Sequence, residues 1–289
     1  MKGRTWWLRP LAGVALLGVV VWQVGSGPFL DGVRSVDAPT LAAGVLLGVP
    51  VTVACAWRWH LVARELGLDV GLRSAVASCY RSQLLNSTLP GGVLGDVHRG
   101  VRHGRAAGDG ALGLRSVVWE RVAGQAVQVV LTAGVLLLLP SPLRSPALVA
   151  AVCLVVLAGV ALARVAPAAV RAPGVLLAST VAVACHVATY LLAARAVGVT
   201  ASPARLVPLA LVVLLAMAVP LNVAGWGPRE GVAAWLFGAA GLGVAAGVAT
   251  AVAYGVVATA ATLPGIVVLL AERSPRAVPV LAVGGGSHG

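Results

Sequence analysis

Long apolar stretches recur along this chain, and they restrict its fold to what a lipid bilayer allows. Leu11–Val24, Ala147–Ala163 and Val244–Leu270 carry no charged side chain. Charged residues make up 10% of the 289 residues, against roughly 25% in soluble domains, and the mean hydropathy is +0.96. Because a bilayer offers the backbone no hydrogen-bond partners, helices are the simplest way to cross it. The sequence therefore predicts an all-α, polytopic transmembrane helical bundle.

About six full membrane spans are expected. Lys2, Arg4 and Arg9 precede the first span, so the positive-inside rule predicts a cytoplasmic N-terminus. Glu272, Arg273 and Arg276 follow the last span, and we expect the C-terminus on the same side. The expected spans are Leu11–Val24, Thr40–Trp57, Ser116–Leu139, Ala147–Ala163, Gly174–Val197 and Val244–Leu270, the last bent at Pro264 and Gly265.

The segments around these spans carry further expectations. Gly25–Pro39 is interpreted as an outer loop, and Trp57–His60 as an aromatic belt and basic flank at the inner surface. Residues 1–276 are expected to form one integral membrane domain, and the glycine-rich residues 277–289 a disordered tail. A bacterial inner membrane, or plasma membrane, is the expected location of this multi-pass chain.

One stretch, Asn86–Arg99, lies between apolar segments without being apolar itself. The preceding residues, Ser74–Leu89, have a helical pattern but are too polar for a lipid-facing span. Pro90, Gly91 and Gly92 end this helix. Basic residues follow, so both ends of the segment are expected in the cytoplasm. This pattern is typical of a re-entrant element, which lipid tolerates only where protein or a watery cavity surrounds the backbone.

A second stretch in the other half of the chain has similar content. The apolar segment that begins at Arg205 breaks at Pro220–Pro228, and Glu230–Leu242 follows as another apolar arm. We expect this pair to enter from the opposite side of the membrane. Two opposed broken elements predict an inverted repeat with a site near the midplane. Eight ordinary spans is the competing interpretation. The residues expected to break the helices are Pro90, Gly91, Gly92, Gly95, Gly225 and Gly227.

Polar side chains within these segments are the candidate binding residues, because a charge inside a membrane is costly and faces a cavity or a partner. Arginine suits a phosphate, which its planar fork can hold through two hydrogen bonds. Arg121, Gln125, Gln128 and Thr132 follow one helix face and are expected to face the bundle interior. The substrate-binding candidates are Arg81, Gln83, Asn86, Asp96, Arg99, Glu120, Arg121, Asn222, Arg229 and Glu230.

Each charged candidate also has a structural interpretation. Asp96 and Arg99 would then cap a helix in cytoplasmic water, Glu120 and Arg121 would form an interfacial pair, and Arg229 would form a salt bridge with its neighbour. His186 is interpreted as a core histidine whose hydrogen-bond partner is Tyr190, one helical turn further on. The cysteines Cys55, Cys79, Cys153 and Cys185 form no CxxC pair and are expected in the core.

Several function classes lack support in the sequence. The formal net charge is +12, but no basic domain with interleaved aromatic residues accompanies it, so nucleic acid is not an expected partner. The arginines instead suit anionic lipid headgroups. There is no HExxH or Walker motif. We therefore expect no metal site and no cofactor, and a function other than catalysis is favoured.

The first broken element resembles a known family. Gln83, Asn86, Pro90, Gly91, Gly95, Asp96 and Arg99 are spaced as in the first signature of the lysylphosphatidylglycerol synthase transmembrane family, which is also called flippase-like. Glu120-Arg121 and Gly225-x-Gly227-x-Arg229-Glu230 are similar to its later signatures. The resemblance covers roughly Leu11–Leu270. In that family the membrane domain flips an aminoacylated phospholipid, and a separate soluble domain makes the lipid.

The resemblance implies a lipid transporter without the soluble synthase domain, so the synthase activity is not expected here. The implied ligand is a lipid with a phosphate headgroup: a phospholipid, an aminoacyl-phospholipid or a polyprenyl-phosphate-linked lipid. The resemblance also implies that a separate lipid-modifying enzyme is a partner. Two alternatives stay open, namely a membrane-embedded transferase with Asp96 or Glu230 as base and an accessory protein of a cell-envelope lipid or glycan pathway. The lipid, the direction of transport, the energy source and the oligomeric state are not determined by the sequence.

Overall fold

The computed structural model describes residues 18, 21–89, 92–138, 159, 164, 166–217 and 227–273, and these residues form helices and connecting turns without a strand. This confirms the expected helical bundle. Four helical segments in the described part are long and apolar enough to cross a membrane: Ala38–Glu65, Gly110–Leu138, Pro173–Ala196 and Val244–Glu272. The other two expected spans, Leu11–Val24 and Ala147–Ala163, lie almost entirely outside the described residues.

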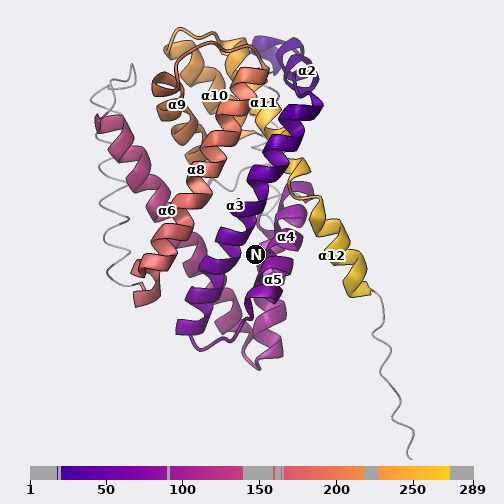
Figure 1. Ribbon diagram of the computed structural model, residues 1–289, viewed down its shortest axis with the longest axis vertical. Coiled ribbons are helices and arrows are strands. Elements are labelled where there is room, and N and C mark those ends of the chain that lie inside the picture. Colours follow the sequence, from indigo (N-terminus) through magenta and orange to yellow (C-terminus); the bar gives the residue numbers. More distant parts are fainter. Residues whose placement is uncertain are drawn as a thin grey trace, which may run out of the picture.

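The first half of the bundle places a pair of short helices between two long ones (Figure 1). The long helices are α3 (Ala38–Glu65) and α6 (Gly110–Leu138), and the short ones are α4 (Leu72–Thr88) and α5 (Leu94–Ala106). With a rise of about 1.5 Å per residue, α5 is only about 20 Å long, too short for the roughly 30 Å of hydrocarbon in a bilayer. The two short helices therefore form a hairpin that enters and returns, as the sequence predicts.

The second half repeats this order with a hairpin from the opposite end of the bundle (Figure 1). Here α8 (Pro173–Ala196) precedes the short helices α9 (Pro203–Ala216) and α10 (Pro228–Ala239), and α11 (Val244–Ala260) follows them. In Figure 1, α4–α5 occupies the lower part of the bundle and α9–α10 the upper part. The long helices α3 and α8 pack closely and run in opposite directions. This is the arrangement of an inverted repeat.

Two further helices extend these halves. The helix α2 (Gly27–Arg34) packs against α11, so the expectation of a loop over Gly25–Pro39 is wrong. Pro28 near its start supplies a backbone angle suited to the first helical turn. The last expected span is interrupted as predicted, because α12 (Pro264–Arg273) begins at Pro264 after a turn that follows α11. A short 3₁₀ helix, Ala168–Arg171, precedes α8.

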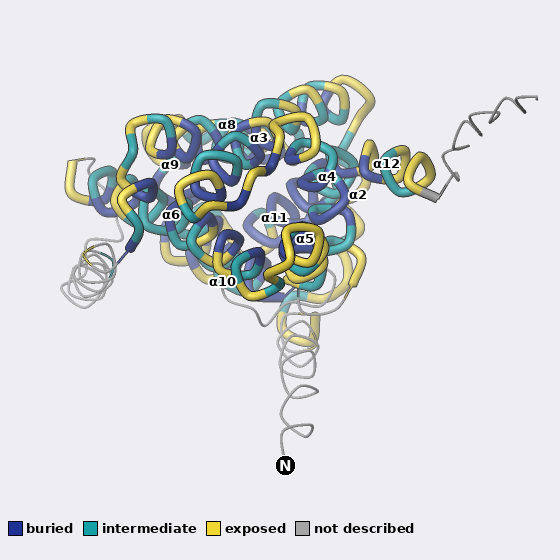
Figure 2. The backbone as a smooth tube through the Cα atoms, turned by 90° about the horizontal axis from the view of Figure 1, so that it is seen from below, coloured by how far each residue is buried: buried dark blue, intermediate teal, exposed yellow. Residues whose placement is uncertain are grey.

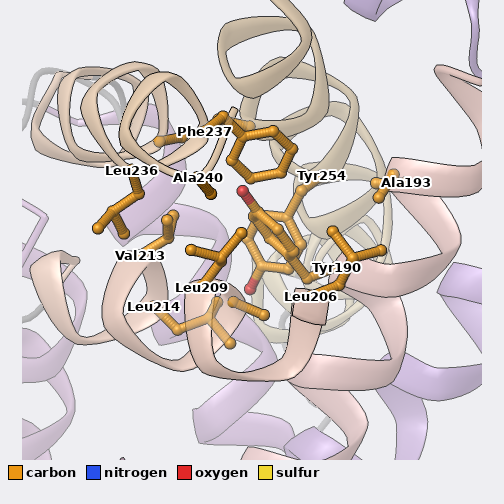
Figure 3. Close-up of a cluster of buried hydrophobic side chains, with 14 of the residues drawn as sticks. Tyr190, Ala193, Leu206, Leu209, Val213, Leu214, Leu236, Phe237, Ala240 and Tyr254 are labelled. Carbon is orange, nitrogen blue, oxygen red and sulfur yellow. The ribbon is translucent and has the colours of Figure 1, made fainter. Parts of the chain in front are cut away.

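Buried residues concentrate where the helices meet, and exposed apolar side chains cover the outside (Figure 2). The largest apolar cluster joins α8, α9, α10 and α11, with Tyr190, Leu209, Phe237 and Tyr254 at its centre (Figure 3). A smaller cluster around Trp59 and Leu68 joins α3 to α4 and α6. The upper hairpin is therefore held in the largest apolar cluster, whereas the lower hairpin combines a smaller apolar cluster with buried polar groups.

Candidate functional site

The position of α5 against α6 depends on glycine. A Cβ atom on Gly113 would lie 2.0 Å from the carbonyl oxygen of Gly100 and 2.7 Å from the Cα atom of Gly104. No real side chain tolerates such a distance, so the two backbones are in direct contact here. This close approach brings the first turn of α5, with Asp96 and Arg99, towards Glu120 and Arg121 on α6.

These four residues and Arg58 form one network of charges at the tip of the first hairpin, which we call the tip network. Arg99 Nη2 lies 2.7 Å from Glu120 Oε2 and 3.1 Å from Asp96 Oδ1. Asp96 also pairs with Arg121, and Glu120 also pairs with Arg58, whose Nε donates to Oε1 over 2.9 Å. Each carboxylate therefore holds two arginines, and Arg99 connects the two carboxylates.

Sequence reasoning missed Arg58, which it assigned to a basic flank at the membrane surface. The structure corrects this assignment, since Arg58 is buried in α3 and its Nη1 also donates to Ser179 Oγ on α8 over 3.2 Å. A Cβ atom on Gly124 would lie 2.7 Å from Arg58 Nη1, so this glycine makes room for the guanidinium group. The aromatic-belt interpretation is also wrong for Trp59, which is fully buried.

Neighbouring side chains fix the geometry of the tip network. Asn86 Nδ2 donates to Asp96 Oδ2 over 2.9 Å, and its Oδ1 accepts from the backbone N–H of Gly95 over 2.8 Å. Asn86 thus fastens the end of α4 to the start of α5. The guanidinium carbon of Arg99 lies 4.6 Å from the centre of the Trp59 ring, within the range of a cation–π interaction. Gln83 accepts a hydrogen bond from Thr52 of α3 over 2.9 Å.

The tip network carries an excess of positive charge. It contains three arginines and two carboxylates, which gives a formal charge of +1. All nine acidic residues of the chain lie in the described part, and these three arginines make ion pairs only with Asp96 and Glu120. Arg121 exposes 49% of its side chain, whereas Asp96 exposes 9%. The excess charge is therefore available at Arg121 to a further anion.

The tip network lies deep in the bundle. Glu120 and Arg121 follow the start of α6 by ten and eleven residues, or about 15 Å along the helix axis. Asp96 precedes the end of α5 by the same ten residues. Asp96 and Arg99 are buried, which argues against their interpretation as capping residues in surface water. Glu120 and Arg121 pair with other residues and not with each other.

The charges of the second hairpin are arranged more locally. Arg229 Nε donates to Glu230 Oε1 over 2.9 Å, and Glu230 Oε2 accepts from the backbone N–H of Gly227 over 2.7 Å. Glu230 thereby caps its own helix, α10. The guanidinium carbon of Arg229 lies 5.5 Å from the ring centre of Tyr254 on α11. Both residues are buried, and together they carry no net charge.

The other predicted residues lie elsewhere in the bundle, at the two helix breaks, or outside the described residues. Arg81 is fully buried and pairs with Glu272 of α12, away from the tip network. Thr132 of the polar stripe is buried as expected, but Arg121 is half-exposed. Pro90, Gly91, Asn222, Gly225 and Cys153 lie outside the described residues. Gly92 and Gly227 both have positive φ angles, 62° and 128°, which fits their predicted role at the two breaks.

The expected hydrogen bond between His186 and Tyr190 is wrong. His186 Nδ1 instead lies 2.9 Å from the hydroxyl oxygen of Tyr254, which comes from α11. Tyr190 packs against the Tyr254 ring with 5.7 Å between the ring centres. Of the cysteines, Cys79 is buried, while Cys55 and Cys185 are partly buried, and all three are free thiols.

Comparison with known proteins agrees with this arrangement. The model of one protein family, described as Lysylphosphatidylglycerol synthase TM region, matches residues 6–174. The chain belongs to this family. The matched region contains the first hairpin, α6 and all five residues of the tip network, whereas α9, α10 and α11 lie beyond it. No curated protein and no solved structure matches the chain.

Membership of the lysylphosphatidylglycerol synthase TM region family and the apolar helices together identify a multi-pass membrane protein. Within this family member, the tip network is the feature that needs a functional explanation. A buried charge that lacks a counter-charge is expensive in a membrane and usually marks a ligand or ion pathway. No group of three or more histidine, cysteine or acidic side chains among the described residues is arranged to hold a metal ion.

Proposed function

We propose that this membrane protein binds a lipid with a phosphate headgroup at the tip network and moves it between the two leaflets. The observation that carries the proposal is the formal charge of +1, with Arg121 half-exposed and no further acidic side chain engaged with it. A phosphate oxyanion would supply the missing negative charge and accept charge-assisted hydrogen bonds from the guanidinium group. Arg58 and Arg99, which are already held by carboxylates, position Arg121 through Glu120 and Asp96.

The inverted repeat supports the transport part of the proposal. In transporters built this way, the substrate binds near the midplane where broken helices meet, and the repeats rock about that point. The first hairpin carries the tip network, and the second hairpin enters from the opposite end of the bundle (Figure 1). The substrate class is a phospholipid, an aminoacyl-phospholipid or a polyprenyl-phosphate-linked lipid, and a separate enzyme that makes or consumes the lipid is the proposed partner.

Leaflet exchange in proteoliposomes tests the proposal. Fluorescent phosphatidylglycerol, lysylphosphatidylglycerol, a polyprenyl phosphate and a neutral diglycosyl diacylglycerol, which has a large polar headgroup without phosphate, would be compared with the wild-type chain, Arg121→Gln and Arg73→Gln. Arg73 is an exposed arginine on the same hairpin, so its variant is a control for loss of charge. Loss of one charge-assisted hydrogen bond costs about 1.5–3 kcal/mol, so exchange should fall by about tenfold or more in Arg121→Gln.

The expected result is protein-dependent exchange of the phosphate-bearing lipids that Arg121→Gln loses and Arg73→Gln keeps. Protein-dependent exchange of the diglycosyl diacylglycerol at the same rate as the charged lipids would contradict a headgroup site. Equal loss in both variants would show that overall charge, and not the tip network, controls the rate.

A further inference from the structure

A second cluster of arginines lies between the tip network and the surface of the bundle. Glu272, near the end of α12, pairs with Arg81 of α4 and with Arg102 of α5. Two arginines and one carboxylate again give a formal charge of +1. Arg81 is fully buried, and its Nε has no hydrogen-bond partner among the described residues. Arg102 exposes 48% of its side chain.

The depth of this cluster differs from that of the tip network. Arg102 precedes the end of α5 by four residues, or about 6 Å, whereas Asp96 precedes it by about 15 Å. Asp96, Arg99 and Arg102 are spaced by three residues, so they lie along one side of α5. Arg105, in the last turn of α5, continues this spacing, so the basic groups extend from the edge of the bundle to the tip of the hairpin. Arg102 lies between Arg105 and Arg99 on this path.

The helix that carries Glu272 is attached to the bundle in a way that permits displacement. A turn before Pro264 separates α12 from α11, and α12 diverges from the other helices towards its end (Figures 1 and 2). Contact is closest at its start, where a Cβ atom on Gly265 would lie 2.6 Å from the Tyr80 carbonyl oxygen. Val267 and Leu270 are well exposed, as on a helix that faces lipid. The ion pairs of Glu272 are therefore the polar attachment of its far end.

We propose that Arg81 and Arg102 form a second phosphate site for the incoming lipid, and that Glu272 occupies it as an internal competitor. A carboxylate and a phosphate diester both present oxygens that guanidinium groups can hold through paired hydrogen bonds. When a headgroup displaces Glu272, α12 moves away from α5 and opens a lateral path from the lipid to the tip network. This inference rests on the proposed function, since it names the first position that the transported lipid occupies.

Replacing Glu272 by glutamine removes the competing carboxylate and tests this inference. The full chain would be kept in micelles of a maltoside detergent, which contains no phosphate, and titrated with a short-chain phosphatidylglycerol, and separately with inorganic phosphate. Glu272→Gln should bind the lipid about tenfold more tightly than the wild-type chain does. Adding Arg102→Gln to this variant should abolish the gain, and because Arg102 is half-exposed, its replacement is compatible with folding. Glu65→Gln removes an exposed acid from the end of α3 and is the matched control, with affinity changed less than about twofold.

Three results would overturn the inference. The first is unchanged or weaker lipid binding in Glu272→Gln, as expected if Glu272 only fastens α12. The second is an equal gain in Glu65→Gln, which would indicate a general effect of charge. The third is binding of inorganic phosphate as tightly as the lipid, which would assign the site to a free anion.

The failure of this inference can be separated from the failure of the proposed function. If the wild-type chain exchanges lipids and Arg121→Gln does not, but Glu272→Gln leaves lipid affinity unchanged, the second phosphate site is rejected and the proposed function stands. If Glu272→Gln gains affinity but the wild-type chain exchanges no lipid, the site is retained as a binding site and transport is rejected.

Discussion

The two hairpins have the same place in their repeats but hold their charges differently. At the tip of α4–α5, five charged residues from α3, α5 and α6 form a network with one excess positive charge. At the start of α10, Arg229 is balanced by the adjacent Glu230 and lies beside Tyr254, which belongs to the apolar cluster shown in Figure 3. The first hairpin therefore has charge available to a ligand, and the second holds a neutral pair. Under the proposed function, a similar backbone would serve binding in one half and packing in the other.

In both halves of the bundle, nevertheless, a glycine makes room for a buried arginine. Gly124 on α6 makes room for the Arg58 guanidinium, and Gly255 on α11 makes room for that of Arg229, where a Cβ atom would lie 2.2 Å from Nη2. In each half, a long helix thus has a glycine against which a buried arginine lies. The difference between the halves lies in what pairs with the arginine, because Glu120 comes from a separate helix and Glu230 comes from the same turn.

Neutralising the central carboxylate of each half should give the largest effect. Glu120→Gln removes the carboxylate from two buried arginines, Arg58 and Arg99, and should lower the free energy of unfolding by about 3–5 kcal/mol. Glu230→Gln removes the carboxylate from one arginine, Arg229, and its amide oxygen can still accept the hydrogen bond that caps α10. We therefore expect its loss in free energy of unfolding to be about half that of Glu120→Gln. Chemical unfolding in mixed micelles would measure both.

A second replacement would check this explanation. Arg58→Gln added to Glu120→Gln removes one of the two uncompensated charges and should recover part of the lost stability. If Glu230→Gln proves as destabilising as Glu120→Gln, the second hairpin depends on its charges as strongly as the first, and the contrast between the hairpins is wrong.

The backbone at the two breaks should respond to alanine to different extents. Gly92 has φ 62°, in the left-handed region that other residues reach at a cost of about 1 kcal/mol. Gly227 has φ 128° and ψ −89°, which side chains rarely adopt, so Gly227→Ala should cost about 2–3 kcal/mol. The same unfolding measurement compares the two variants. A larger loss in Gly92→Ala would show that the first break is the more strained one.

The smallest effect is expected at the ring beneath Arg229. Tyr254→Phe keeps this ring but removes the hydrogen bond to His186, with an expected loss of about 1 kcal/mol. Because the Arg229–Glu230 pair does not use the hydroxyl group, lipid exchange should stay close to that of the wild-type chain. A strong loss of exchange in this variant would place His186 and Tyr254 in the transport pathway.

Much of this fold could be predicted from the sequence, for physical reasons that differ between residues. The hairpins were predictable because prolines and glycines such as Pro90 and Gly227 interrupt otherwise helical segments, and because α4 is polar and followed by basic residues. The short helix α2 was missed because Gly25–Pro39 contains the glycines and prolines of an ordinary loop. Its position depends on packing against α11, more than 200 residues away in the sequence.

The site was predicted in part. Asp96, Arg99, Glu120 and Arg121 were identified from their cost in a membrane, and the structure brings all four together. Arg58 was missed because an arginine between two tryptophans has the pattern of a membrane-surface flank. Only its pairing with Glu120, 62 residues further along the chain, reveals its role. Such long-range pairs leave no local signal in a single sequence.

The central claim is that the excess charge at the first hairpin, and not the neutral pair at the second, receives the headgroup. The most direct test compares exchange of phosphatidylglycerol in proteoliposomes of the wild-type chain, Arg121→Gln and the neutral double variant Arg229→Gln/Glu230→Gln. We predict that Arg121→Gln loses about tenfold or more. The double variant should keep at least roughly a third of the wild-type rate, because the amide oxygen introduced by Glu230→Gln can still cap α10. Equal loss in the two variants, or a greater loss in the double variant, would contradict the claim.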